Sequence, residues 1–409
     1  MKIIKAVNLS VNFCGFEMIN PFMLSSAPPT GTGEMIKRAF KAGWGGAVTK
    51  TLALDKDIAH NVTPRLASLA FPGKADEPKK LYGLENIELI TDRPLQIWLD
   101  EIKEIKREFP DRLLVASIMA GGNDKAAWQE LTHRCQEAGA DMLELNFSCP
   151  HGMPEKGMGA AIGQNPEITE QATSWVVETA GIPVMAKMTP NITDIRVPAK
   201  AAIRGGADAI SAINTVAVIM GVDLKTLTPQ PDVFGRSTHG GYSGPAIKPI
   251  ALKAVASLAS DLDIPISGIG GIETWSDAAE FILLGASTIQ VCTAVMFHGY
   301  KIIEELEDGL RSFMEDHGFN QIDDFAGLSL SRITEHNSLD RRAKMISSID
   351  KTTCVKCDLC VVSCRDAGYQ ALATGVDRIP IVDKNLCTGC SLCAQVCPVW
   401  DCIKLVTAD

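Results

Sequence analysis

Residues 354–364 read CVKCDLCVVSC, and residues 387–398 read CTGCSLCAQVCP. Each run has the spacing C-x2-C-x2-C-x3-C, which is the spacing of bacterial ferredoxins. In that arrangement the first three cysteines of a run bind one iron-sulfur cubane and the fourth binds the other. The spacing therefore predicts two [4Fe-4S] clusters in a small domain. One would be bound by Cys354, Cys357, Cys360 and Cys397, and the other by Cys387, Cys390, Cys393 and Cys364.

Structural zinc and disulfides are the other common uses of many cysteines. Zinc sites usually take two C-x2-C pairs separated by a loop. A disulfide framework would require a secretory leader, and the first residues, MKIIKAVN, form too short an apolar stretch for one. Iron-sulfur binding is favoured over both. Because such clusters carry single electrons, the remainder of the chain should contain a group that uses them.

Length and composition favour one large domain followed by a small one. The chain has 409 residues, of which 46% are hydrophobic and 22% charged, as in ordinary globular proteins. The formal net charge of -10 argues against nucleic acid or an anionic membrane as the main partner. No apolar run is long enough to span a bilayer. Since cluster-bearing, thiol-rich chains belong in a reducing compartment, we expect a cytoplasmic protein.

Short apolar runs alternate with amphipathic stretches from residue 1 to about residue 316. Eight runs are expected to be strands, and their continuous apolar character indicates that both faces are covered. They are Phe22–Ser25, Ala47–Lys50, Leu114–Met119, Met142–Phe147, Val184–Lys187, Ala209–Asn214, Pro265–Gly268 and Thr288–Val291. Expected helices include Glu34–Lys41, Ile97–Phe109, Ala126–Glu137, Glu167–Thr179, Lys248–Asp261 and Ser276–Leu284.

Four expected helix-to-strand joins contain glycine, which readily takes the positive φ of a helix C-cap. An alternation of eight strands joined in this way predicts an α/β fold, a closed (β/α)8 TIM barrel. An open doubly wound sheet is the alternative, but no Gly-x-Gly-x-x-Gly follows the first strand. The joins are Ala42-Gly43, Ala138-Gly139-Ala140-Asp141, Gly205-Gly206-Ala207-Asp208 and Leu284-Gly285-Ala286-Ser287.

Three segments follow from this pattern. Residues 1–316 are expected to form the barrel, and residues 317–349, which are polar and show no clear strand, a partly helical connector. Residues 350–409 would then form a small ferredoxin-like α+β domain, to whose folding metal binding contributes.

The loop after the fourth expected strand carries the most reactive side chain. Residues 146–153 read NFSCPHGM, and a glycine-rich stretch continues to Gly163. Reactive groups of such barrels lie on loops after strand C-termini, and a mobile loop can exclude water. Cys149 could equally be a small buried residue or a catalyst. Cys14, Cys135 and Cys402 are expected to be structural.

The loops after the seventh and eighth strands suggest a phosphate site. They contain Gly270-Gly271 and Cys292-Thr293. Barrels often bind phosphate with these two loops through bare backbone N–H groups, although a tight turn without a ligand would look the same.

Amine and amide side chains end three further strands, at Lys50-Thr51, Lys187 and Asn214-Thr215. Each of them could be a solvated rim residue. Together with a phosphate site and a supply of single electrons, they suggest flavin mononucleotide (FMN), which interconverts one-electron and two-electron chemistry.

Several of these stretches resemble the dihydropyrimidine dehydrogenase family. They are LELNFSCPHG (143–152), AKMTPN (186–191), AINTV (212–216), GYSGPAIKP (241–249) and GGI (270–272), and CTGCSLC (387–393) resembles that family's C-terminal ferredoxin module. The resemblance covers essentially the whole chain. Its barrel part is shared in outline with dihydroorotate dehydrogenases.

The resemblance implies reduction of uracil and thymine to their 5,6-dihydro forms. It implies that Cys149 is the general acid that protonates C5 as hydride reaches C6. FMN contacts are implied for Ser26, Lys50, Thr51, Lys187, Gly244, Ile269, Gly270, Gly271, Cys292 and Thr293. Pyrimidine contacts are implied for Asn86, Asn146, Ser148, Asn214 and Thr215. Glu88 and His151 are expected to help hold the loop of Cys149 closed.

The chain differs from single-chain members of that family because it shows no dinucleotide fingerprint. It is similar to the separate pyrimidine-reducing subunit of a two-subunit bacterial form. The implied partner is a flavoprotein subunit with FAD that takes electrons from NAD(P)H, and an oligomer is expected.

Three other functions stay open from the sequence. A dihydroorotate dehydrogenase would need a cationic group for the substrate carboxylate. The same scaffold could reduce another cyclic imide or amide. A non-catalytic electron-transfer subunit would contain no flavin.

Overall fold

The computed structural model describes residues 7–57, 59–70, 81–151, 153–367 and 369–408. Gly152, part of the loop motif singled out above, lies outside the described residues. The chain forms two compact units, residues 1–332 and 333–409, and each is described here by itself.

Eight parallel strands close into a barrel in the first unit, in the order β10-β15-β16-β3-β4-β7-β8-β9. The predicted TIM barrel is confirmed, and the open sheet is excluded because β3 pairs with both β16 and β4. All eight predicted strands are present, with ends within three residues of those expected. They are β3 (Phe22–Leu24), β4 (Gly46–Val48), β7 (Leu113–Ile118), β8 (Met142–Asn146), β9 (Val184–Lys187), β10 (Ala209–Ala212), β15 (Ile266–Ile269) and β16 (Thr288–Val291).

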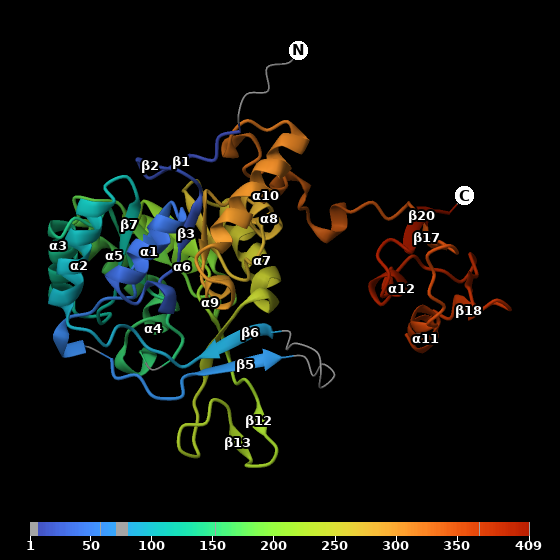
Figure 1. Ribbon diagram of the computed structural model, residues 1–409, viewed down its shortest axis with the longest axis horizontal. Coiled ribbons are helices and arrows are strands. Elements are labelled where there is room, and N and C mark those ends of the chain that lie inside the picture. The colour runs from blue at the N-terminus through green and yellow to red at the C-terminus, as the bar shows by residue number, and fades with distance from the viewer. Residues whose placement is uncertain (1–6, 58, 71–80, 152, 368, 409) are drawn as a thin grey trace. The chain divides into compact units, whose positions relative to one another are not determined.

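Helices surround the barrel strands and return the chain from one strand to the next (Figure 1). Each of the four predicted joins contains one glycine with positive φ, namely Gly43, Gly139, Gly206 and Gly285. The helices are α1 (Gly33–Ala42), α2 (Leu95–Glu108), α3 (Lys125–Glu137), α4 (Ala160–Gly163), α5 (Pro166–Val177), α6 (Arg196–Arg204), α7 (Lys248–Ala259), α8 (Trp275–Leu283), α9 (Thr293–His298) and α10 (Ile302–His317).

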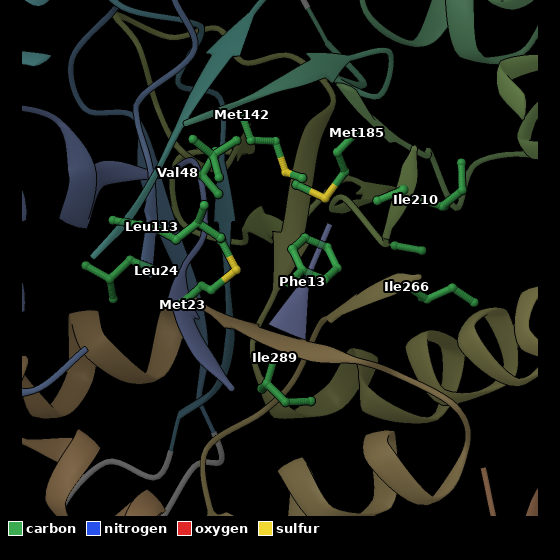
Figure 2. Close-up of a cluster of buried hydrophobic side chains, with 14 of the residues drawn as sticks. Phe13, Met23, Leu24, Val48, Leu113, Met142, Met185, Ile210, Ile266 and Ile289 are labelled. Carbon is green, nitrogen blue, oxygen red and sulfur yellow. The ribbon is translucent and has the colours of Figure 1, made fainter. Parts of the chain in front are cut away.

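One end of the barrel is closed by the hairpin of β1 (Val11–Phe13) and β2 (Phe16–Met18). The Phe13 ring is fully buried. It lies among apolar side chains of the barrel strands, including Met23, Met185 and Ile266 (Figure 2). The hairpin thus fills the barrel interior at this end. Burial of an aromatic side chain of this size contributes about 1.5–3 kcal/mol to stability.

A second, antiparallel sheet lies at the opposite end of the barrel unit from β1 and β2 (Figure 1). Its order is β11-β14-β6-β5, and the small hairpin β12–β13 extends beyond it. This sheet was not predicted. Its strands are β5 (Leu66–Ala70), β6 (Leu81–Asn86), β11 (Val216–Val218) and β14 (Gly240–Ser243), and the hairpin comprises β12 (Val222–Asp223) and β13 (Thr228–Pro229).

Among its described residues, the second unit contains two antiparallel strand pairs and two α-helices. The strands β17 (Met345–Ile349) and β20 (Ile403–Thr407) pair, as do β18 (Leu372–Thr374) and β19 (Pro380–Val382). The helices are α11 (Leu359–Asp366) and α12 (Leu392–Gln395). The expected connector 317–349 is divided between the units, and its last residues form β17 although no strand was expected there.

Within the described residues, no helix combines the length and the apolar character that crossing a bilayer requires.

Candidate active site and cluster cavities

A cavity of about 1100 Å³, its open mouth included, lies at the C-terminal ends of the barrel strands. The structure brings together here all but one of the predicted barrel-site residues. Those lining the cavity are Ser26, Lys50, Thr51, Asn86, Asn146, Cys149, Lys187, Asn214, Thr215, Gly244, Ile269, Gly270, Gly271, Cys292 and Thr293. The exception is Ser148, which is fully buried directly beside the cavity wall.

A chain of hydrogen bonds fixes the amide side chains of the cavity. Asn146 Nδ2 donates to Thr51 Oγ1 at 2.9 Å, and Ser148 Oγ donates to Asn146 Oδ1 at 3.0 Å. Asn214 Nδ2 donates to Ser148 Oγ at 2.8 Å, while Asn214 Oδ1 accepts from Thr215 N at 2.7 Å. Both carboxamides are therefore held in one orientation before a ligand arrives. A ring edge of alternating carbonyl and N–H groups is matched by carboxamides, which offer an acceptor and donors on one side chain.

Cys149 is held as a neutral thiol. Its Sγ donates to the His151 carbonyl at 3.5 Å. Burial raises the pKa of the Cys149 thiol to about 11, although the charge of Lys50 opposes the shift. A group that must give a proton has to carry it at neutral pH, and Cys149 does.

His151 links this loop to the segment after β6. Its Nε2 lies 3.1 Å from the Glu88 carbonyl. Its Nδ1 is buried and has no hydrogen-bond partner among the described side chains and backbone. Burial lowers the pKa of His151, so the imidazole is neutral at neutral pH. His151 and Glu88 were expected to help hold the loop of Cys149 closed, and the contact between His151 Nε2 and the Glu88 carbonyl joins these two residues.

Two glycines let the loop lie directly against the end of β8. Gly159 has a φ of +57, and a Cβ there would come 2.9 Å from the Cys149 carbonyl oxygen. A Cβ on Gly163 would come 2.0 Å from the Phe147 carbonyl oxygen. Any side chain at these two positions would displace the segment that carries Cys149.

Both lysines that line the cavity are paired with carboxylates. Lys50 Nζ lies 3.2 Å from Glu88 Oε1, and Lys187 Nζ lies 3.2 Å from Glu144 Oε1. Glu144 is fully buried inside the barrel and also accepts from Ser211 Oγ at 3.0 Å. Sequence reasoning overlooked Glu144, although one acidic residue inside the apolar strand MLELN was a usable signal.

The cavity has the features that FMN requires. Gly270 and Gly271 have positive φ, and a Cβ on Gly271 would come 2.6 Å from the Lys248 backbone nitrogen. This stretch therefore presents bare backbone, as phosphate loops do. Gln290, which also lines the cavity, has a buried Oε1 with no partner among the described residues. An unpaired buried polar atom and a glycine cradle both fit a bound polar ligand.

Two smaller cavities in the second unit are lined by the cysteine runs. One, of about 320 Å³, is lined by Cys354, Cys357, Cys360 and Cys397. The other, of about 340 Å³, is lined by Cys387, Cys390, Cys393 and Cys364. The fourth cysteine of each run thus lies with the first three of the other run, as the spacing predicts. Cys402 also lines the first cavity.

The cysteines surround these cavities and do not meet at one point. In the part of the chain that the structure describes, no three Cys, His, Asp or Glu side chains converge as the ligands of a single metal ion do. A cubane takes one thiolate at each of four irons, so its ligands stand apart. The two cavities fit cubanes in this respect.

Comparison with protein families divides the chain in the same way. Residues 8–314 match the family described as dihydroorotate dehydrogenase. Residues 347–405 match the family described as 4Fe-4S dicluster domain. The second unit is therefore a dicluster domain, and zinc and disulfides are excluded as the use of its eight spaced cysteines.

Curated relatives align with most of the chain. The chloroplastic dihydropyrimidine dehydrogenase (NADP(+)) of Arabidopsis thaliana is 48% identical over 82% of this chain and 80% of its own. The NAD-dependent dihydropyrimidine dehydrogenase subunit PreA of Escherichia coli (strain K12) is 45% identical over 97% of this chain and 95% of its own. The catalytic subunit of dihydroorotate dehydrogenase B (NAD(+)) from Pyrococcus abyssi is 38% identical over 79% of this chain and 99% of its own.

The last of these relatives matches about the length of the barrel unit, whereas the PreA subunit matches barrel and cluster domain together. The chain thus belongs to the dihydropyrimidine dehydrogenase family, with a barrel of the dihydroorotate dehydrogenase type and a C-terminal 4Fe-4S dicluster domain.

Proposed function

We propose that this chain reduces the 5,6 double bond of uracil and thymine. The observation that carries the proposal is that one cavity is lined by the protonated Cys149 thiol, by the fixed carboxamides of Asn146 and Asn214 and by the glycines expected to hold a flavin phosphate. The relatives named as dihydropyrimidine dehydrogenases support it over most of the chain.

The carboxamides of Asn86, Asn146 and Asn214, with Thr215, would bind the pyrimidine edge. Asn86 Nδ2 donates to the Gly241 carbonyl at 3.1 Å, and its Oδ1, which accepts no hydrogen bond from the described residues, is available to a ring N–H. A ring without the matching pattern would leave buried polar groups unpaired, at about 1–3 kcal/mol each, and would be rejected.

FMN would be held by the backbone of Gly244, Gly270 and Gly271 and by Lys50, Lys187 and Thr293, and when bound it would supply the hydride for C6. Cys149 would supply the proton for C5. The C5–C6 π bond is thus replaced by two C–H bonds, and the Cys149 thiolate regains its proton from solvent. The loop of Cys149 and His151 would keep water from the reacting face.

Two electrons are needed for each ring reduced, and the dicluster domain is the place where they would enter singly. We propose an NAD(P)H-oxidising flavoprotein subunit with FAD as their source. The name of the Escherichia coli relative, a subunit of an NAD-dependent enzyme, supports this partner. We further propose that the chain works as an oligomer in the reducing cytoplasm.

Dihydroorotate oxidation is the second candidate, favoured by the family match over residues 8–314 and by the Pyrococcus abyssi relative. Its substrate carries a carboxylate that needs a cation. Both lysines of the cavity already have carboxylate partners, which favours an uncharged ring.

One experiment separates these candidates and the non-catalytic alternative. The protein is purified without oxygen, its FMN and iron are measured, and it is reduced with dithionite. Uracil should then reoxidise the reduced protein and yield dihydrouracil. In a separate assay with the oxidised protein and an electron-accepting dye, dihydroorotate should reduce little of the dye. Protein that contains iron but no FMN would contradict the proposal, and so would faster turnover of dihydroorotate than of dihydrouracil with the dye.

A further inference from the structure

A buried hydroxyl group lies against one of the two cysteine sets of the second unit. Ser347 is the middle residue of β17 and is 6% exposed. Its Oγ lies 3.0 Å from Cys393 Sγ and 3.9 Å from Cys387 Sγ. Ser347 lines the cavity of these cysteines, which fits one cubane, here called the second cluster, and it does not line the other cavity.

The position of Ser347 is fixed by the backbone. The strand β17 pairs with β20, and Ser347 lies opposite Leu405 in this ladder. The turn inside the second cysteine run packs against the start of β17, because Gly389 has a φ of +69 and a Cβ there would collide with the Met345 carbonyl oxygen. Since the strand and the turn touch backbone to backbone, the hydroxyl of Ser347 is held close to the sulfurs.

Two adjacent serines of β17 have different surroundings. Ser347 is buried and Ser348 is exposed, as successive residues of a strand with one covered face are. A buried hydroxyl without a partner would cost free energy. Among the described residues, the Ser347 hydroxyl makes its hydrogen bonds with the two cysteine sulfurs and with no other group. The sulfurs therefore satisfy the hydroxyl.

The ligand state of the cysteines decides which atom donates. A cysteine that binds iron is a thiolate and has no proton to give, so the hydroxyl of Ser347 has to be the donor. The shorter contact is the one to Cys393 Sγ. A backbone donor serves the same set, since the Ala371 N–H donates to Cys364 Sγ at 3.3 Å. The second cluster would thus be bound by thiolates that accept hydrogen bonds from fixed groups of the chain.

We propose that Ser347 raises the reduction potential of the second cluster by donating a hydrogen bond to the Cys393 thiolate. Reduction adds a negative charge that the thiolate sulfurs share, and a hydrogen bond to a more negative acceptor is stronger. The bond therefore stabilises the reduced cluster more than the oxidised one, and hydrogen bonds to the sulfurs are among the factors that set cluster potentials. The inference depends on the dicluster domain and not on which ring the barrel reduces.

The hydroxyl makes the two clusters unequal. Each is expected to have four cysteine ligands, so differences between them have to come from the groups around the sulfurs. An electron that enters the domain is held more firmly at the second cluster than the thiolates alone would hold it. Because Ser347 acts through Cys393, it is a positioning residue of the electron relay.

The test is an anaerobic redox titration of the full chain, followed by electron paramagnetic resonance of the reduced clusters. In Ser347→Ala the ratio of reduced to oxidised second cluster at a fixed potential should fall about tenfold, which for one electron moves the midpoint by about 59 mV to a more negative value. The other midpoint should stay in place, because Ser347 does not line the first cavity. Ser348→Ala is the matched control, since it removes an exposed hydroxyl from the same strand and should leave both midpoints unchanged.

A second pair of variants separates the hydrogen bond from the size of the side chain. Ser347→Thr and Ser347→Val introduce side chains of nearly the same shape, and only threonine keeps a donor. Ser347→Thr should keep the midpoint of the wild type, whereas Ser347→Val should shift it as Ser347→Ala does. Iron analysis of every variant should give about eight atoms per chain, which shows that both clusters are present.

Equal midpoints in Ser347→Ala and the wild type would overturn the inference, and so would equal midpoints in the threonine and valine variants. A shift of both clusters by the same amount would also count against it, because it would indicate a change of the whole domain. Loss of iron from Ser347→Ala would assign Ser347 to cluster assembly instead. Failure of the proposed function is seen separately, since these measurements involve no pyrimidine.

Discussion

The ammonium of Lys187 lies 3.2 Å from the carboxylate of Glu144, and both are buried inside the barrel under the active-site cavity. Glu144 also accepts from Ser211 Oγ at 3.0 Å and from Gln290 Nε2 at 3.4 Å. The lysine that would face the flavin is therefore paired with a carboxylate, and side chains of two further strands hold that carboxylate in place.

Glu144→Gln should destabilise the barrel. Removing one partner of a buried ion pair leaves the other charge uncompensated, at a cost of about 3 kcal/mol or more. The free energy of unfolding can be measured with urea and tryptophan fluorescence. The control is Glu178→Gln, whose pair with Lys125 at 2.6 Å is half exposed and should contribute less than about 1 kcal/mol. Equal losses in the two variants would contradict the argument.

Cys149→Ala should remove the proton donor while leaving the cofactors in place. General acids contribute about 10²–10⁴-fold, so turnover of uracil should fall by at least about 100-fold. Cys149→Ser, a weaker acid of similar size, should retain only a small residual rate. FMN and iron contents serve as the control for folding. Full activity of the alanine variant would end the assignment of Cys149 as the acid.

The reactivity of Cys149 should depend on pH in a defined direction. Burial raises its pKa to about 11, so the proton is retained through neutral and moderately alkaline pH and the thiolate appears only near that value. Labelling by iodoacetamide, followed at the Cys149 peptide by mass spectrometry, should therefore be slow at pH 8 and reach half of its maximum near pH 11. A midpoint at or below the ordinary thiol value would contradict the burial argument.

Asn214→Ala should weaken capture of the pyrimidine more than it slows the chemistry. The Asn214 amide is fixed by Ser148 and Thr215, and its loss leaves ring groups unpaired, at about 1–3 kcal/mol. The apparent affinity for uracil should fall about tenfold or more in steady-state kinetics, with a smaller change in kcat. An unchanged affinity would remove Asn214 from the binding residues.

The barrel could be predicted from the sequence because its strands are buried on both faces and its turns need glycine. The run Leu114–Met119 is apolar except for Ser117, and Gly139 has the positive φ that the join requires. Both signals are local, so neither depends on knowing what packs against them.

The antiparallel sheet could not be predicted because its pairing is distant. Asn86 in β6 pairs with Gly241 in β14, and the buried positions of β6 are Gly83 and Glu85, so its sequence shows no alternation of apolar and polar residues. The residue pattern of β6 therefore does not indicate a strand on its own, because the partner strand β14 lies far along the chain. The same holds for charge: Lys50 was found as a strand-end cation, but its partner Glu88 follows a strand that the sequence did not reveal.

The two cluster cavities give a prediction about single ligands. Cys397 lies with the cysteines of the other run, whereas Cys402 lies in the same cavity but outside the ferredoxin spacing. Cys397→Ser should therefore lose one cluster, which halves the iron from about eight to about four atoms per chain. Cys402→Ser is the matched control and should keep all of it. Both are measured by iron analysis and by electron paramagnetic resonance of the reduced protein. If Cys402→Ser lost the cluster and Cys397→Ser retained it, the crosswise assignment would be wrong at this position, and Cys402 would be the fourth ligand.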